Sequence, residues 1–235
     1  LPRRQRQMCI RDSIESLPSG ILFWRSMTHW IGGMGIIVLA VAILPLLGIG
    51  GIQLFSAEAP GPNNDKLHPR ITDTAKRLWL IYVFFTFLEA ILLSFAGMSI
   101  FDAVNHAMST MASGGFSTKN NSLAYWNHLP LVHYIIILFM FLAGTNFVLS
   151  YFALTGKFKK VLDDNEFVTF LAFVIIFSLI VFLVIYNSVD LNNSFFDFPQ
   201  VFGKLEGSIR HALFQVLAVI TTTGFVTSDY TAWTP

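Results

Sequence analysis

Four apolar stretches, each long enough to cross a lipid bilayer, constrain what this chain can fold into. They run from about Ile31 to Ile49 (or from near Phe23), Leu78 to Ile100, Leu131 to Thr155 and Phe167 to Asn187. A helix needs about 20 apolar residues to cross the hydrocarbon layer, and irregular backbone cannot face lipid. Only 12% of the 235 residues are charged, whereas soluble domains carry about 25%. The sequence therefore predicts an all-α membrane protein.

Charge and metal-binding residue types narrow the range of partners. The formal net charge is +1, and no basic stripe exists to neutralise phosphates, so we expect no nucleic acid partner. The six histidines are scattered without metal-ligand spacing, so we expect neither a transition-metal site nor a cofactor. The single cysteine, Cys9, excludes a disulfide within the chain.

Residues 1–13 do not match the pattern of the rest. A basic run (Arg3, Arg4, Arg6) precedes Met8-Cys9-Ile10-Arg11-Asp12-Ser13, and no signal-peptide apolar run is present. The Met8–Ser13 hexapeptide is also what one reading frame of a common sequencing adapter would encode. We expect residues 1–13 to be a non-native leader, the alternative being a native basic cytosolic arm.

The connections between the spans are of two kinds. Gly50 to Ala75 is polar and rich in turn formers, and Gly156 to Glu166 is short and charged. The other two connections each hold an apolar segment too short to span, followed by a glycine-containing cluster. These segments are Ala103 to Met111, before Ala112-Ser113-Gly114-Gly115-Phe116, and Ile209 to Ile220, before Thr221-Thr222-Thr223-Gly224-Phe225. A short helix and a glycine turn between two spans predict a re-entrant pore loop.

The two glycine clusters belong to an internal repeat. Aligning Gly115 with Gly224 also pairs Phe116 with Phe225, Thr118 with Thr227 and Ala103 with Ala212. The repeating unit is span, re-entrant helix, glycine turn, span. The chain then divides into the end of a first repeat (14–50), a cytoplasmic loop (51–77), a complete second repeat (78–156), a second cytoplasmic loop (157–166) and the first part of a third repeat (167–235). This division makes the chain an internal fragment of a larger ring.

Basic residues predict the orientation. The two plain connections carry Lys66, Arg70, Lys76, Arg77, Lys157, Lys159 and Lys160, whereas the two re-entrant connections carry only Lys119, Lys204 and Arg210. By the positive-inside rule, the plain loops lie in the cytoplasm and both glycine turns lie toward the outer face.

The chemistry of the glycine turns suits a cation that sheds its water. Backbone carbonyls can replace a hydration shell without trapping the ion, and glycine lets them crowd together. The predicted ion-binding residues are Ala112, Ser113, Gly114, Gly115, Thr221, Thr222, Thr223 and Gly224.

Two polar residues inside the spans call for a separate interpretation. Glu89 and Asn146 are predicted to give polar support within the membrane, a structural role being weighed against an ion-pathway role for Glu89.

Two other classes of function are open on the residues alone. A secondary cation carrier with alternating access would place the two glycine turns on opposite sides of the membrane. An intramembrane serine protease would pair Ser113 with His133. Repetition of the turn, with Thr222 at the position of Ser113, favours a ring over one catalytic centre.

From Ser19 to Tyr230 the sequence resembles the TrkH/TrkG/KtrB family of bacterial potassium transporters, and most closely its TrkH branch. The residues that carry the resemblance are Leu22-Phe23-Trp24-Arg25-Ser26, Trp30-Ile31-Gly32-Gly33-Met34-Gly35, Ala57-Glu58-Ala59-Pro60-Gly61-Pro62, Asp65-Lys66-Leu67-His68-Pro69-Arg70, Gly114-Gly115-Phe116-Ser117-Thr118, Ala143-Gly144-Thr145-Asn146-Phe147 and Thr221-Thr222-Thr223-Gly224-Phe225.

The resemblance implies potassium uptake, without enzymatic chemistry, across the bacterial inner membrane. It also implies four span–pore-loop–span repeats around a pseudo-fourfold pore, a homodimer and a cytosolic TrkA-type nucleotide-binding partner. Gly115 and Gly224 would then be the filter glycines of repeats two and three.

Overall fold

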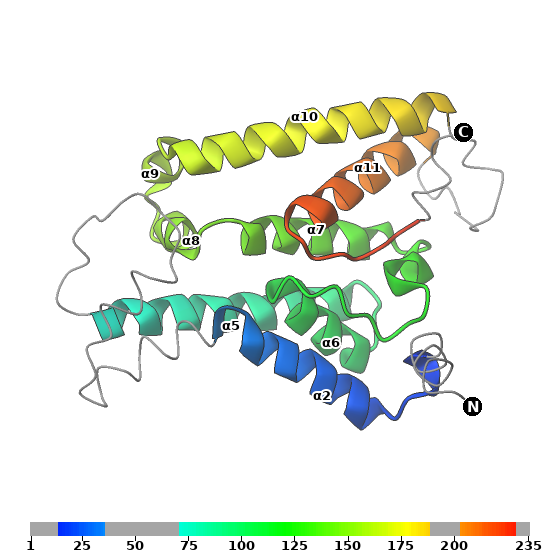
Figure 1. Cartoon of the computed structure of the whole chain (residues 1–235), viewed down its shortest axis with the longest axis horizontal. Coiled ribbons are helices and arrows are strands. Elements are labelled where there is room, and N and C mark those ends of the chain that lie inside the picture. The colour runs from blue at the N-terminus through cyan, green and yellow to red at the C-terminus, as the bar shows by residue number, and fades with distance from the viewer. Residues whose placement is uncertain (1–13, 36–70, 189–202, 229–235) are drawn as a thin grey trace, which may run out of the picture.

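The computed structural model describes residues 14–35, 71–188 and 203–228, and every regular element within them is helical (Figure 1). In chain order the elements are η1 (Ile14–Ser16), α2 (Ser19–Trp30), η2 (Ile31–Gly35), α5 (Ile71–Phe95), α6 (Ile100–Met111), η3 (Ser122–Trp126), α7 (Pro130–Gly144), α8 (Phe147–Leu154), α9 (Phe158–Leu162), α10 (Asn165–Ser188) and α11 (Lys204–Ile220). The expected leader, most of the first predicted span and the first cytoplasmic loop up to residue 70 lie outside the described residues.

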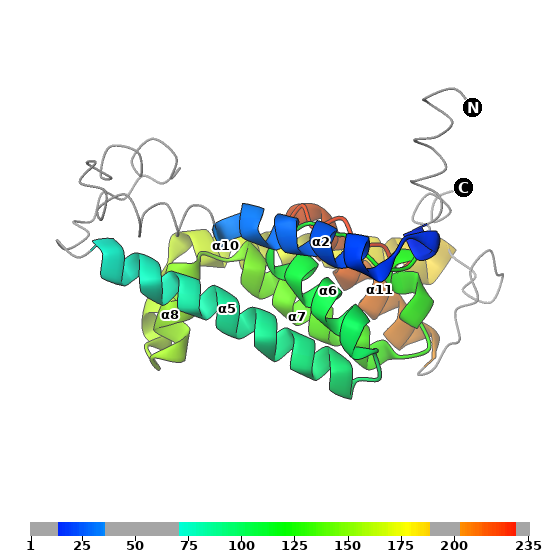
Figure 2. The ribbon, with the colours of Figure 1, turned by 90° about the horizontal axis from the view of Figure 1, so that it is seen from below.

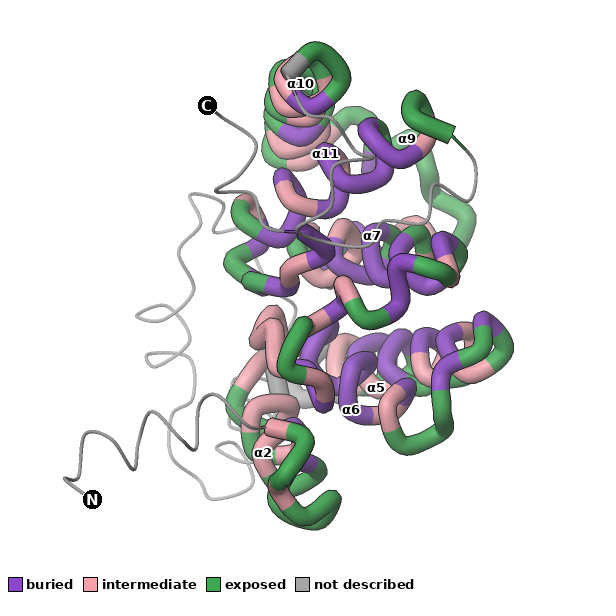
Figure 3. The backbone as a smooth tube through the Cα atoms, turned by 90° about the vertical axis from the view of Figure 1, so that its right-hand side faces the viewer, coloured by how far each residue is buried: buried purple, intermediate pink, exposed green. Residues whose placement is uncertain are grey.

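Two of these helices are long and apolar enough to cross a membrane unaided. They are α5, over Arg77–Phe95, and α10, over Asn165–Asn187. Only 11% of the α10 span is buried within the chain, and most of the α10 tube in Figure 3 has the colour of exposed residues. Its outward side chains include Phe173, Ile176 and Leu179. A helix with apolar side chains on its outer surface is suited to lipid.

The third predicted span is not one straight helix. Its α7 and α8 parts are bent by 112° at a short break, although the sequence predicts one stretch from Leu131 to Thr155. Thr145 is extended (φ −91°, ψ 157°), and the side chain of Asn146 accepts a 3.0 Å hydrogen bond from the Val148 amide. This N-cap starts α8 in a new direction, because it satisfies an amide that a continuous helix would bond internally.

The helices form a stack with α7 near its middle. In Figure 1 the order runs from α10 and α11 through α7 to α5 with α6, and then to α2. When the molecule is viewed from below, the stack of helices is seen to be flat, with α5 and α2 nearest the viewer (Figure 2). The main cluster of buried side chains joins both halves of the stack and includes Leu93, Ile136, Met140, Phe214 and Phe225. Close packing of these side chains holds the helices together, since burial from lipid gains little hydrophobic energy.

The helix α6 begins at a local sequence signal. The Ser99 hydroxyl accepts a 3.1 Å hydrogen bond from the Asp102 amide and donates one of 2.8 Å to the Asp102 carboxylate. This reciprocal pair caps the helix N-terminus. At its other end α6 ends at Met111, and the first glycine turn begins at the next residue, Ala112.

Candidate functional site: the two glycine turns

The two glycine turns have the same backbone conformation. Helix α6 ends at Ala112 (φ −84°, ψ 0°), and α11 ends at the equivalent Thr221 (φ −82°, ψ 1°). The next residue is left-handed in both turns, with φ of 52° at Ser113 and 57° at Thr222. Left-handed non-glycine residues are uncommon. Their recurrence at equivalent positions shows that the internal repeat extends to individual torsion angles.

The two turns also meet each other. Gly115 and Gly224 have φ values of 65° and 77°, in the region that favours glycine. A Cβ atom built on Gly115 would overlap the carbonyl oxygen of Thr223, whereas one built on Gly224 would meet nothing within 4 Å. The turn after α6 therefore touches the turn after α11 through backbone atoms. Both predicted glycines contribute to this arrangement.

Backbone amides of the turns point back into their own helices. The Gly114 amide donates to the Ser109 carbonyl at 2.8 Å, and the Gly224 amide donates to the Ala218 carbonyl at 3.0 Å. Among the described residues, no hydrogen bond is accepted by a backbone carbonyl from 112 to 116 or from 221 to 225. These two amides are thus satisfied within their own repeat, and the carbonyl oxygens of both turns are left available to a ligand.

The chain leaving each turn is held by a threonine hydroxyl. Thr118 donates a 2.6 Å hydrogen bond to the Asp102 carboxylate near the start of α6. Thr227, its repeat partner, lies 2.9 Å from Nδ1 of His211, in the middle of α11. The two threonines are paired in the sequence, but their partners were not predicted, because the equivalent position holds an acid in one repeat and an imidazole in the other.

The remaining predicted residues have varied environments. The Thr221 hydroxyl donates to the Leu217 carbonyl at 2.7 Å and lies 2.7 Å from the Thr223 hydroxyl, so these two side chains brace their turn. Glu89 on α5 is completely buried, and within the described chain neither of its carboxylate oxygens has a hydrogen-bond partner. Asn146 is exposed and caps α8.

A serine nucleophile and its base are not assembled. His133 Nε2 lies 3.0 Å from the Leu123 carbonyl oxygen, and His133 Nδ1 lies 2.7 Å from Arg210 Nη1. Both ring nitrogens therefore face partners other than Ser113. A general base must reach the hydroxyl that it activates, so this geometry does not support the protease alternative.

Two contributors to the turns are not among the predicted ion-binding residues. The Ser109 hydroxyl accepts a 2.6 Å hydrogen bond from the Phe116 amide. Arg25 on α2 donates a 2.6 Å hydrogen bond to the Ser117 carbonyl. The arginine stands out in the sequence as a charge beside an apolar stretch, which indicates a partner but does not identify it.

Comparison with known proteins places the chain. Residues 5–235 match the family model TrkH, described as "Cation transport protein". The match starts inside the predicted leader, whose origin stays untested. The chain is 45% identical over 222 residues to the Trk system potassium uptake protein TrkH of Escherichia coli K12, and 39% identical over 224 residues to TrkG of the same organism. Each comparison covers 94% of this chain and 44% of the relative, so the chain spans less than half of their length.

A solved structure gives the same answer. The crystal structure of the potassium transporter TrkH from Vibrio parahaemolyticus superposes with a TM-score of 0.71 at 36% identity, covering 94% of this chain and 42% of that one. The helical fold, the spans and the family match agree, and the chain belongs to the TrkH family of cation transport proteins.

Proposed function

We propose that this chain forms two sides of a potassium-selecting pore in a bacterial inner-membrane uptake protein. The chain covers less than half the length of relatives that are named potassium uptake proteins. We assign the same function to the complete protein of which this chain is a part. Potassium is the transported substrate. No bond is made or broken, because the work consists of removing water from the ion and replacing it with oxygen ligands.

The observation that carries this proposal is the meeting of two equivalent turns. Carbonyl oxygens of residues 112–115 and 221–224 accept no hydrogen bond among the described residues, and the turns approach at Gly115 and Thr223. In the proposed pore these oxygens face the ion from two adjacent sides. The Thr221 and Thr223 hydroxyls keep the third-repeat turn in shape.

Complete coordination requires more sides than this chain supplies. We infer four span–pore-loop–span repeats around a pseudo-fourfold axis, of which residues 14–50, 78–156 and 167–235 are the end of the first, the whole second and the front of the third. The complete protein is proposed to form a homodimer in the lipid bilayer. Its cytoplasmic loops, 51–77 and 157–166, are where a TrkA-type nucleotide-binding subunit would bind.

A secondary cation carrier is the second candidate. The broken helix at α7 and α8 favours it, since carriers use interrupted helices near the membrane centre. The contact between the two turns supports the channel-like alternative, because a carrier of this kind would place them on opposite sides. Potassium uptake that saturates at low potassium concentration and requires a sodium or proton gradient would favour the carrier.

Growth on limiting potassium tests the proposed function. The complete gene is expressed in bacteria lacking their own potassium uptake, as wild type, Gly224→Ser and Gly156→Ser. The control is matched, because Gly156 has φ 76° against 77° at Gly224, and a Cβ built on either glycine meets nothing within 4 Å. We expect rescue by wild type and Gly156→Ser, and weak or sodium-sensitive rescue by Gly224→Ser.

The other outcomes separate two kinds of error. No rescue by a wild-type protein shown to be present in the membrane would point to another cation or a missing partner. Equal rescue by wild type and Gly224→Ser would mean that the filter lies elsewhere.

A further inference from the structure

One face of α2 runs along the second-repeat turn. The face consists of Arg25 and His29, which are four residues apart and so lie one above the other on α2, and of Gly33, which follows in η2 at a kink in the backbone. The Arg25 guanidinium lies 4.7 Å from the centre of the Phe116 ring and donates to the Ser117 carbonyl at 2.6 Å. Arg25, at one end of this face, therefore contacts the chain where it leaves the turn.

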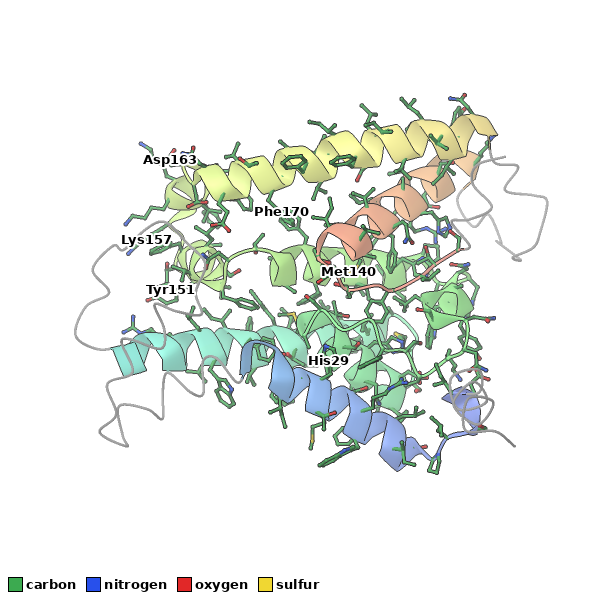
Figure 4. All side chains as sticks on the ribbon, in the orientation of Figure 1. His29, Met140, Tyr151, Lys157, Asp163 and Phe170 are labelled. Atoms are coloured by element: carbon green, nitrogen blue, oxygen red, sulfur yellow. The ribbon has the colours of Figure 1, made fainter. Side chains whose placement is uncertain are left out.

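The lower part of the same face contacts the turn itself. The His29 ring packs edge-on against Phe116 at 5.0 Å, and a Cβ built on Gly114 would lie 2.6 Å from His29 Nε2. A Cβ built on Gly33 would lie 3.2 Å from the Ala112 Cβ. In Figure 4, His29 is labelled between α2 and the turn that follows α6. The α2 face thus forms a seat for the turn from residue 112 to residue 117.

Helix α7 seats the third-repeat turn in the same way. A Cβ built on Gly144 would lie 2.6 Å from Thr221 Cγ2, and Thr221 is the repeat partner of Ala112. Gly144 therefore corresponds to Gly33. The residues four and eight positions earlier, Met140 and Ile136, are buried in the same cluster as Phe225, and Figure 4 labels Met140 on α7. This second seat is apolar where that of α2 is polar.

The carbonyl two residues after the glycine is held in both repeats. Ser117 O receives the Arg25 guanidinium, while Val226 O accepts hydrogen bonds from the Leu123 and Ala124 amides at 3.0 and 3.1 Å. In each case the donors come from the preceding repeat. The backbone amides carry no net charge, whereas the half-buried Arg25 side chain is charged, and hydrogen bonds from charged donors are the stronger ones. We therefore expect the Arg25 guanidinium to hold the chain that leaves the turn after α6 more firmly than a neutral donor would.

We propose that Arg25 is a positioning residue for ion selection, because it fixes the outgoing end of the second-repeat turn through the Ser117 carbonyl. This inference rests on the proposed function, since it assumes that the turn carbonyls bind the ion. Arg25 does not touch the ion in this account. Without it, the outgoing chain relaxes and the carbonyl spacing that distinguishes potassium from sodium is lost.

The test measures ion preference rather than growth alone. Rubidium uptake by the complete protein is followed in membrane vesicles at rising sodium, for wild type, Arg25→Gln, Arg25→Lys and Arg77→Gln. The control Arg77 makes a comparable contact, a 3.0 Å hydrogen bond to the Tyr151 hydroxyl and a 5.8 Å approach to its ring, but no contact with either turn. Protein in the membrane is quantified for each variant.

We expect Arg25→Gln, whose side chain is too short to reach Ser117, to lower the rubidium-over-sodium preference by about tenfold, on the scale of one hydrogen bond to a charged group. Arg25→Lys, whose ammonium ends closer to the carbonyl, should lower it by about threefold. Arg77→Gln should leave the rubidium-over-sodium preference unchanged; because Arg77 lies in the loop 51–77 where the regulatory subunit is proposed to bind, its total uptake rate is not used as the readout. A preference unchanged in Arg25→Gln would overturn the proposal. If Arg25→Gln does not reach the membrane, an unchanged preference in Arg25→Lys overturns it instead.

Failure of the underlying function has a different signature. A wild-type protein that reaches the membrane but takes up neither rubidium nor potassium would reject the proposed function before any variant is compared.

Discussion

At the scale of single residues, equivalent positions in the two turns keep the same backbone with different side chains. Ser109 supplies a side-chain acceptor to the Phe116 amide, whereas its repeat partner is Ala218. Asp102 and His211 each bond the threonine that follows their turn. Each side chain is therefore adapted to its own repeat, while the torsion angles at the turn are common to both.

Within the described residues, Glu89 is a buried carboxyl group with no ion-pair partner. It is fully buried in α5, its oxygens have no hydrogen-bond partner within the described residues, and the Thr110 side chain of α6 faces it. We predict that Glu89→Gln, which keeps the shape and removes the charge, leaves potassium uptake within about twofold of wild type and stability equal or higher. Glu89→Leu should behave similarly if packing alone is required.

Uptake rates and thermal unfolding of the complete protein in detergent check this prediction. A loss of uptake on the order of tenfold or more in Glu89→Gln, with normal protein levels, would assign the carboxylate to the ion pathway instead.

At the scale of elements, the end of α7, where the helix breaks before α8, packs directly against the glycine turn that follows α11. The closest neighbours of a Cβ built on Gly144 are Thr221 Cγ2 at 2.6 Å and Phe170 Cζ at 3.2 Å. Any side chain at this position would therefore overlap the turn. The break and the glycine together allow the spanning element of one repeat to support the turn of the next.

A double substitution tests this contact. Gly144→Ala inserts a methyl group against Thr221, and overpacking of this kind costs about 1–3 kcal/mol, so we predict lower thermal stability and slower uptake. Thr221→Ser removes the clashing methyl and keeps the hydroxyl that bonds Leu217 O and Thr223 Oγ1. The double variant Gly144→Ala with Thr221→Ser should therefore recover both properties.

Thr221→Ser alone is the control and should resemble wild type. If the double variant is no better than Gly144→Ala, the damage comes from the helix break itself rather than from contact with the turn.

The sequence predicts the elements better than their bends. Apolar length identifies α5 and α10, and the paired glycine clusters identify both turns. The α7–α8 break escapes this reasoning because Gly144, Thr145 and Asn146 interrupt the apolar stretch only briefly, and a capping asparagine looks like any polar residue in a span. Contacts such as Arg25 with Ser117 span 92 residues. They depend on how repeats pack, which the residue types alone do not determine.

At the scale of the whole molecule, the orientation in the membrane can be tested directly. Tyr125, in the connection predicted to be external, is 50% exposed, and Lys157 in the short charged loop is exposed as well. With the single cysteine changed to serine (Cys9→Ser), we predict that Tyr125→Cys reacts with a membrane-impermeant maleimide from outside only. Lys157→Cys should react from inside only.

Spheroplasts and inverted membrane vesicles from cells expressing the complete protein provide the two sides. Labelling of both cysteines from the same side would contradict the assigned orientation and the placement of the cytoplasmic loops.

The different side chains that hold the two turns have a consequence for how the proposed pore can evolve. In a ring of identical subunits, one codon change alters every side of the ion path at once. Here Asp102 with Thr118 and His211 with Thr227 are encoded separately. In the proposed pore, a mutation therefore adjusts one side of the ring while the others stay as they were, so selection can act on ion preference in steps smaller than a symmetric assembly permits.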